Sequence, residues 1–298
     1  MREAIRLFEE TGETRGRLRA VRPSFGGLVR GELLKINNQR TTWLLALIVL
    51  MLVALPYIVV YRAVAPDLLL TPHFFDYFCA EMIGLMRAWT GLYLLILTAH
   101  VIGLEYQLGT VRVLLARGVG RLQLLLAKLA AIGLVALLLL LGCLVVHAVM
   151  LGGVLAWHGS LNLLADLREH ITLYLLTVLI SMVASVFLSA AVTVLSRSLA
   201  FGLSAALVFF PLDNFGAFLV PLGTRLTHAD FWQKITAYFL GPNLNQMSAA
   251  LVHEPGFNLG FGPAVDVDGT HTLLVSLAYM LIFVIIAVAL TIKRDVHE

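Results

Sequence analysis

Charged side chains are scarce in this sequence. Asp, Glu, Lys and Arg make up 13% of its 298 residues, whereas hydrophobic residues make up 60%. The mean hydropathy is +0.91. So few charges could not cover the surface of a soluble domain of this size. The composition therefore excludes an ordinary soluble protein and predicts an all-α, polytopic membrane protein.

Cysteine is also scarce, and no metal-ligand spacing occurs. The two cysteines, Cys79 and Cys143, lie far apart in any plausible topology, so no disulfide framework is expected. His253 and His271 lack the spacing of a metal site. The segment Asp266–Gly269 starts like a calcium loop, but position 277, where such a loop needs glutamate, is leucine. We therefore predict a turn there and no metal on this chain.

Catalytic motifs are missing as well. None of the four lysines belongs to a phosphate-binding loop, in which Gly, any four residues and Gly-Lys are followed by Ser or Thr. No serine sits in a nucleophile elbow. We therefore expect no catalytic residue and no cofactor on this chain. Residues 1–40 are strongly charged and have no long apolar core, so no cleavable signal peptide is expected either.

Long apolar segments are what the sequence has in abundance. Six of them predict six membrane spans: Trp43–Tyr61, Ala88–Leu104, a third within Leu122–Trp157, Ile171–Ser196, Ser198–Val220 and Thr272–Ile292. As one helix, the third run would reach about 54 Å, against a hydrocarbon core of about 30 Å. It must therefore either project into the cytoplasm or bend, near Gly142 or at Gly152-Gly153.

Basic residues predict the orientation. Sixteen of the 21 Lys and Arg residues fall on one side of these spans. The other side holds Arg62, Arg87, Arg168, Arg225 and Lys234. The positive-inside rule then places both termini and residues 105–121 in the cytoplasm.

The first 42 residues are predicted to form a polar tail followed by an interfacial helix, ahead of a six-span domain at 43–298. Pro23-Ser24 is a helix start, after which Phe25, Val29, Leu33 and Ile36 share one face. Such a helix could lie along the bilayer or pack on other protein. On the outer side, residues 62–83 form a connection rich in aromatic residues. The longer loop 222–271 predicts two short interfacial or re-entrant helices.

A polar interruption between the second and third spans organises the chain. A helix from Glu105 to Ala116 would place Leu104, Leu108, Val111 and Leu115 on one arc and Glu105 with Arg112 on a neighbouring polar arc. Gly118 and Gly120 would end it. Such a helix suits docking onto a partner outside the bilayer, although an ordinary basic cytoplasmic loop would show a similar pattern.

This interruption resembles the loop between the second and third spans of type-two ATP-binding-cassette (ABC) transporter permeases. That family typically shows an acidic residue, Gly-Thr, a basic residue, paired Leu, a basic residue opening the third span and a following Lys. The matching residues here are Glu105, Gly109, Thr110, Arg112, Leu114, Leu115, Arg121 and Lys128. The family often has a Pro before the second basic residue, where this chain has Arg117–Gly120, so the turn could differ in detail.

The resemblance implies an exporter permease in a bacterial or archaeal plasma membrane. Two permease subunits, identical or different, would form the pathway. A separate ABC ATPase carrying ATP and Mg would dock beneath residues 105–121, and no nucleic acid is expected among the partners. The implied docking residues are Glu105, Gly109, Thr110, Arg112, Arg117, Arg121 and Lys128. The alternatives are an ion-gradient-driven transporter and a non-transporting scaffold subunit.

Two ionisable residues are candidates for the substrate pathway. Asp213 is the acidic residue nearest a span interior, and such residues are costly in a bilayer. It could line a pathway next to Pro211, or it could cap a helix that ends there and pair with Arg225. His147, within the third span, could relay protons or be a hydrogen-bonded core histidine.

Overall fold

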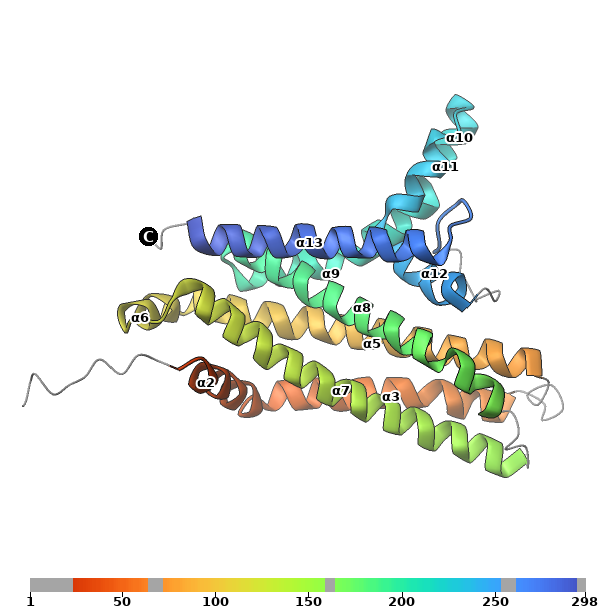
Figure 1. The fold of residues 1–298 in the computed structure, drawn as a ribbon, viewed down its shortest axis with the longest axis horizontal. Helices are drawn as coiled ribbons and strands as arrows, with labels where there is room; N and C mark the ends of the chain where they lie inside the picture. Colours follow the sequence, from red (N-terminus) through yellow and green to blue (C-terminus); the bar gives the residue numbers. More distant parts are fainter. Residues whose placement is uncertain (1–23, 64–71, 159–163, 253–260, 294–298) are drawn as a thin grey trace, which may run out of the picture.

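The computed structural model describes residues 24–63, 72–158, 164–252 and 261–293, and Figure 1 shows their arrangement. These residues form helices and connecting turns, with no strand among them. Six of the helices are long and apolar enough to cross a membrane. The protein is therefore an all-α, integral, multi-pass membrane protein, as the composition predicts.

The six long helices run roughly parallel in one bundle (Figure 1). They are α3 (Arg40–Ala63), α5 (Pro72–Gln107), α7 (Arg121–His158), α8 (Leu164–Ser196), α9 (Leu199–Leu219) and α13 (Gly269–Lys293). Five of them contain one predicted span each, and α9 matches the predicted fifth span to within one residue at either end. The predicted outer connection at 62–83 is wrong in its second half, because α5 already begins at Pro72, a residue suited to the first turn of a helix.

The long third apolar run is one helix. Helix α7 has 38 residues, which corresponds to about 57 Å. It is not interrupted at Gly142, Gly152 or Gly153. Of the two alternatives, the structure therefore favours a helix that extends beyond the hydrocarbon core.

A short helix, α2 (Phe25–Asn37), precedes the first span. Its N-cap is Ser24, whose Oγ accepts a hydrogen bond from the Gly27 N–H at 3.2 Å. Helix α2 packs mainly on α7. Ile36 is 2% exposed, whereas Phe25 at the start of the helix is 46% exposed. The helix therefore packs on this chain's own bundle through its second half.

Helices α5 and α8 form the centre of the bundle, and both pack closely on α9. The α8–α9 turn is tight, with Arg197 in the left-handed region at φ 53°. Next to it, a Cβ at Gly103 would lie 2.7 Å from Leu199 Cα, so α5 and α9 approach each other more closely than a side chain would allow.

Four short helical segments lie between α9 and α13. They are α10 (Leu222–Thr227), α11 (Phe231–Ile235), the 3-10 helix η2 (Thr236–Tyr238) and α12 (Leu240–Val252). The pair α10–α11 projects away from the bundle in Figure 1. Helix α12 is instead buried against α13 and α8, and Leu240, Leu244 and Met247 are at most 1% exposed. The predicted short helices exist, but α12 lies inside the fold.

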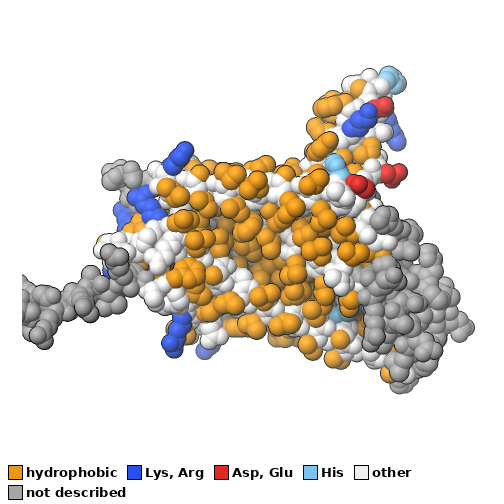
Figure 2. Space-filling model, in the orientation of Figure 1, with side chains coloured by type: hydrophobic (Ala, Val, Ile, Leu, Met, Phe, Trp, Pro, Cys, Tyr) orange, Lys and Arg blue, Asp and Glu red, His pale blue; other side chains and the backbone are white. Residues whose placement is uncertain are grey.

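The surface divides by side-chain type along the bundle. Figure 2 shows hydrophobic side chains over the middle of the molecule and Lys and Arg gathered at the end where α6 (Thr110–Ala116) lies. A second, smaller group of charged side chains lies on the projecting α10–α11. This division fits a bundle whose middle faces lipid.

Candidate functional site

The turn between α5 and α7 is the first part of the site. The predicted single helix from Glu105 to Ala116 is wrong, because α5 ends at Gln107 and α6 begins at Thr110. Gly109 adopts φ 67° and Gly118 φ 85°, left-handed values that glycine adopts without a Cβ penalty. The two glycines therefore delimit α6 and allow the two turns by which the chain passes from α5 through α6 into α7.

The break at Gly109 changes which side chains face outward. Leu108 is 64% exposed, so it does not join the predicted apolar arc against the bundle. Val111 and Leu115 do face inward and are partly buried. Arg112 and Arg117 are exposed, and Val113 is 51% exposed. The outward surface of the turn therefore combines two guanidinium groups with apolar side chains.

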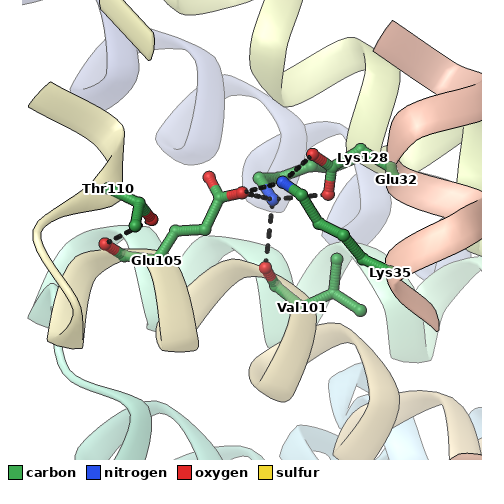
Figure 3. Close-up of polar contacts among 6 residues, drawn as sticks. All are labelled: Glu32, Lys35, Val101, Glu105, Thr110 and Lys128. Carbon is green, nitrogen blue, oxygen red and sulfur yellow. Dashed lines mark hydrogen bonds and ion pairs between the residues drawn. The ribbon is translucent and has the colours of Figure 1, made fainter. Parts of the chain in front are cut away.

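Directly behind the turn lies a network of four ion pairs, drawn in Figure 3. The Lys35 Nζ lies 2.6 Å from Glu32 Oε1 and 2.7 Å from Glu105 Oε1. The Lys128 Nζ lies 2.8 Å from Glu32 Oε2 and 2.9 Å from Glu105 Oε1. Lys128 also donates to the Val101 carbonyl at 3.1 Å. The network therefore joins α2, the end of α5 and the start of α7.

Three of the four charged groups are buried. The side chains of Glu32, Glu105 and Lys128 are 5%, 8% and 5% exposed, whereas Lys35 is 51% exposed. Two carboxylates facing two ammonium groups make the cluster neutral as a whole. Buried charges remain ionised only when they are paired and hydrogen-bonded in this way.

The pKa values of the two α2 residues reflect this pairing. Burial alone would raise the pKa of the Glu32 carboxyl, but Lys128 and Lys35 outweigh that effect and lower it below its usual 4.5. Burial alone would lower the pKa of Lys35, but its hydrogen bonds to Glu105 and Glu32 outweigh that effect and raise it above its usual 10.5. Both groups are therefore charged at neutral pH.

A cavity of 240 Å³ lies under the turn, between the ends of α5, α7 and α13 and the α8–α9 turn. Arg112, Arg121 and Arg197 border it, together with Glu105. The Glu105 Oε2 atom is buried and has no hydrogen-bond partner among the described residues. Arg121 donates to the Ile292 carbonyl at 3.3 Å, which connects α7 to the end of α13.

The predicted docking residues therefore separate into two groups. Gly109, Arg112 and Arg117 lie on the outward surface of the turn. Thr110 and Arg121 are partly buried at the ends of α6 and α7, and the Thr110 Oγ1 lies 3.5 Å from the Glu105 carbonyl oxygen. Glu105 and Lys128 are buried in the network and do not reach the outer surface. They are therefore not part of the exposed surface of the turn.

Glu32 and Lys35 were not identified from the sequence. The signal was present, because Glu32 lies between Val29 and Ile36 on the face of α2 that was predicted to be apolar. A carboxylate on such a face needs a buried cation. Its partner Lys128, however, is 96 residues away along the chain, and helical periodicity gives no information on such a pairing.

At the opposite end of the bundle, Asp213 acts as a helix cap. The α9 helix continues through Pro211, as the predicted fifth span does, so the alternative in which the helix ends there is wrong. The Asp213 carboxylate accepts a hydrogen bond from the Gly241 N–H in the first turn of α12. The capping interpretation therefore describes the residue, but the helix it caps is α12, and this carboxylate bond takes the place of the expected Arg225 pair.

His147 is a core histidine. It is 8% exposed, and its Nδ1 forms a hydrogen bond with the Tyr57 hydroxyl. The Tyr57 ring also packs edge-on against Phe78 and against the His147 imidazole. Neither His147 nor Asp213 lies near the ion-pair network, so the two candidate pathway residues and the turn form no common site.

Comparison with known proteins assigns most of the chain to one family. The model of a family described as "Protein of unknown function (DUF2705)" matches residues 72–297. The chain belongs to this family. The match begins with α5 and extends past the end of α13, so the DUF2705 segment contains the turn, Glu105 and Lys128 but not α2. No curated protein matched the sequence.

Proposed function

We propose that this chain is the membrane-spanning permease subunit of an ABC exporter, and that a separate ATPase docks on the turn around α6. The observation that best supports this proposal is the ion-pair network behind that turn. It ties α2, α5 and α7 together at the root of the turn. A force applied to α6 would therefore reach three helices at once.

The outward surface of the turn supports this role. Arg112 and Arg117 are exposed, and Arg112 has no hydrogen-bond or ion-pair partner among the described residues. A partner surface with carboxylates at its rim would match these two charges. The positive-inside rule assigns this end of the bundle to the cytoplasm, where ATP is available.

The mechanism that follows is mechanical. Closure of two ATPase subunits around ATP would displace α6, and the network would carry the displacement into α2 and α7. Two permease bundles would then rock against each other and change the side from which the pathway is open. ATP and Mg would belong to the partner, and the permease chain would supply the moving surface.

Affinity purification of the tagged full-length chain from its native membranes tests this proposal. An ATPase subunit with a phosphate-binding loop should co-purify. Replacing Arg112 and Arg117 by Glu should abolish its retention, because both charges on the docking surface are reversed. The matched control is Arg225→Glu, which reverses a charge on α10 at the opposite end. Co-purification that is equally sensitive to both changes, or the absence of any ATPase, would contradict the proposal.

A further inference from the structure

A second cavity lies in the outer half of the bundle, as oriented by the positive-inside rule. It has a volume of 450 Å³ and lies between α5, α8 and α9. Its walls are mainly apolar. They include Leu85, Leu92, Leu95, Leu207, Phe210 and Phe215. A cavity of this kind in a bilayer suits a hydrocarbon chain.

One end of the cavity is polar. The Arg87 guanidinium lines it and donates from Nη2 to Asn245 Oδ1 at 2.5 Å, while its Nη1 lies 3.5 Å from Ser181 Oγ. Asn245 in turn donates to Asn214 Oδ1 at 2.7 Å and to the Phe261 carbonyl at 3.0 Å. The groups that hold the guanidinium at the cavity are therefore neutral.

Among the described residues, the carboxylates Glu81 and Asp213 lie near this end, and neither lines the cavity. Glu81, six residues earlier on α5, acts electrostatically on Arg87. Asp213 is bonded to the Gly241 N–H. Within the described lining, the Arg87 guanidinium is thus the charged group that the cavity presents.

The depth of the polar end fits a lipid-like molecule. Arg87 precedes Glu105 by 18 residues, about 27 Å along α5, so it lies near the opposite surface of a hydrocarbon core of about 30 Å. From Arg87 the apolar wall continues inward to Leu95, about 12 Å further. A head group at Arg87 and a chain directed inward would match this order.

A buried polar atom also faces this cavity without a partner. Ser185 is 1% exposed and lines the cavity, and its Oγ has no hydrogen-bond partner among the described residues. Buried hydroxyls normally have one. A hydroxyl, ester or carbonyl oxygen close to the head of a bound amphiphile would supply it.

We propose that this cavity binds a membrane amphiphile whose anionic head, a phosphate or carboxylate, pairs with Arg87 and whose hydrocarbon chain lies between α5 and α9. The planar fork of a guanidinium matches such oxyanions. Binding needs neither ATP nor a partner. Only the additional step, that such an amphiphile is the exported substrate, rests on the proposed function.

Trp89 provides a reporter, because it also lines the cavity. We would replace Trp43, Trp157 and Trp232 by Phe and place the full-length chain in phosphatidylcholine nanodiscs. The probes are dibromostearate and its uncharged methyl ester, whose bromines quench tryptophan, at an alkaline pH that ionises the acid. The proposal predicts saturable quenching, with the acid half-saturating at a concentration on the order of tenfold lower than the ester.

Two variants make the test specific. Arg87→Gln should reduce the acid-to-ester preference to near one, whereas Arg87→Lys should keep part of it. Because each ratio is measured within one variant, a general loss of stability does not imitate this result. Ala88→Leu adds volume at an exposed wall position and should weaken both probes.

Three results would overturn the inference: equal quenching by acid and ester in the parent, quenching that does not saturate, or an unchanged preference in Arg87→Gln. If Arg87→Gln does not fold, an acid preference that is partly kept in Arg87→Lys, together with weaker quenching by both probes in Ala88→Leu, supports the inference. The absence of either result overturns it. The experiment contains no ATPase. Its failure would therefore leave the proposed function untouched, and the absence of a docking ATPase would leave this binding site untouched.

Discussion

The two lysines of the ion-pair network have different environments. The Lys128 side chain is 5% exposed and bridges both carboxylates, whereas Lys35 is 51% exposed. Lys128→Met would leave two buried carboxylates with one half-exposed partner, at a cost of about 3–5 kcal/mol. Lys35→Met should cost far less, because solvent screens an exposed pair. Thermal unfolding of the purified variants in detergent measures the difference.

A double variant separates charge from packing in this prediction. If uncompensated charge is the cause, adding Glu105→Gln to Lys128→Met should recover part of the lost unfolding temperature. If the lysine stem were the main contribution, the second change would give no recovery. Equal destabilisation by Lys35→Met and Lys128→Met would contradict the burial argument.

The stability of the network should depend on pH in a defined window. The pKa of Glu32 is lowered from 4.5, so its contribution is complete above pH 4.5 and is lost as the pH falls through the lowered folded-state value. The pKa of Lys35 is raised from 10.5, so its contribution is complete below pH 10.5 and is lost as the pH rises through the raised folded-state value. Between these limits the contribution should be constant.

Comparison of the parent with Glu32→Gln tests this window. The difference in their unfolding temperatures should be flat between the two limits. It should shrink as the pH falls below 4.5 and through the lowered folded-state value, where the carboxylate of the folded parent becomes protonated. A difference that grows as the pH falls would have the wrong sign and would refute the assignment of Glu32 as an ionised partner of Lys128.

The hydrogen bond from the Gly241 N–H to the Asp213 carboxylate predicts which replacements of Asp213 should lower stability. Asp213→Asn keeps a side-chain oxygen that can accept from the Gly241 N–H, so it should be nearly neutral. Asp213→Ala removes the acceptor and should cost about 0.5–2 kcal/mol, as other N-terminal helix caps do. Unfolding of both variants measures the cap. A large effect of Asn, equal to that of Ala, would show that the negative charge itself is required.

Among the helices, the close approach of α5 and α9 depends on a single glycine. A Cβ at position 103 would meet the Leu199 backbone at 2.7 Å, so α9 would have to move. Gly103→Ala should therefore destabilise the protein by about 1–3 kcal/mol, the range for overpacking. Gly133→Ala on α7 is the control, because a Cβ there meets nothing within 4 Å. It should be neutral or stabilising, since Ala favours helix more than Gly. Destabilisation by both would exclude a specific contact.

The sequence predicted the helical elements well where lipid determines the pattern. Long apolar runs identified all six spans, and the predicted helix start at Ser24 is confirmed, because Ser24 caps α2. The sequence-based prediction failed where backbone conformation at a single residue, or a contact between distant segments, determines the structure. Gly109 breaks a helix that periodicity extends from Glu105 to Ala116, and nothing local indicates that α12 is buried between α13 and α8.

For the candidate site, the sequence predicted the segment but not its internal division. The sequence pattern predicts one docking surface that includes Glu105 and Lys128 together with Arg112. In the structure, Glu105 and Lys128 form ion pairs with Lys35 and Glu32 on α2. Because Lys128 and Glu32 are 96 residues apart, the sequence does not reveal that they pair. The resemblance identifies which residues of the turn match the family pattern. Their burial in the structure then separates the exposed Arg112 from the buried Glu105 and Lys128.

On the scale of the whole molecule, the arrangement is a bundle with two unlike ends. One end carries the turn, the network and most of the positive charge (Figure 2). The other carries the projecting α10–α11 and the amphiphile cavity. The turn and the cavity share α5, because Glu105 and Arg87 lie about 27 Å apart on it. A displacement of α5 at Glu105 would therefore also move the cavity wall at Arg87.

Site-directed cross-linking tests the docking claim most directly. With the buried Cys79 and Cys143 replaced by Ala, a single cysteine would be placed at Arg117 or, as the control, at Arg225. We expect the cysteine at 117 to cross-link to the co-purifying ATPase and to resist membrane-impermeant thiol reagents added to intact cells. The cysteine at 225 should react with these reagents and form no such cross-link. Labelling at 117 from outside intact cells, or a cross-link from 225 in place of 117, would contradict it.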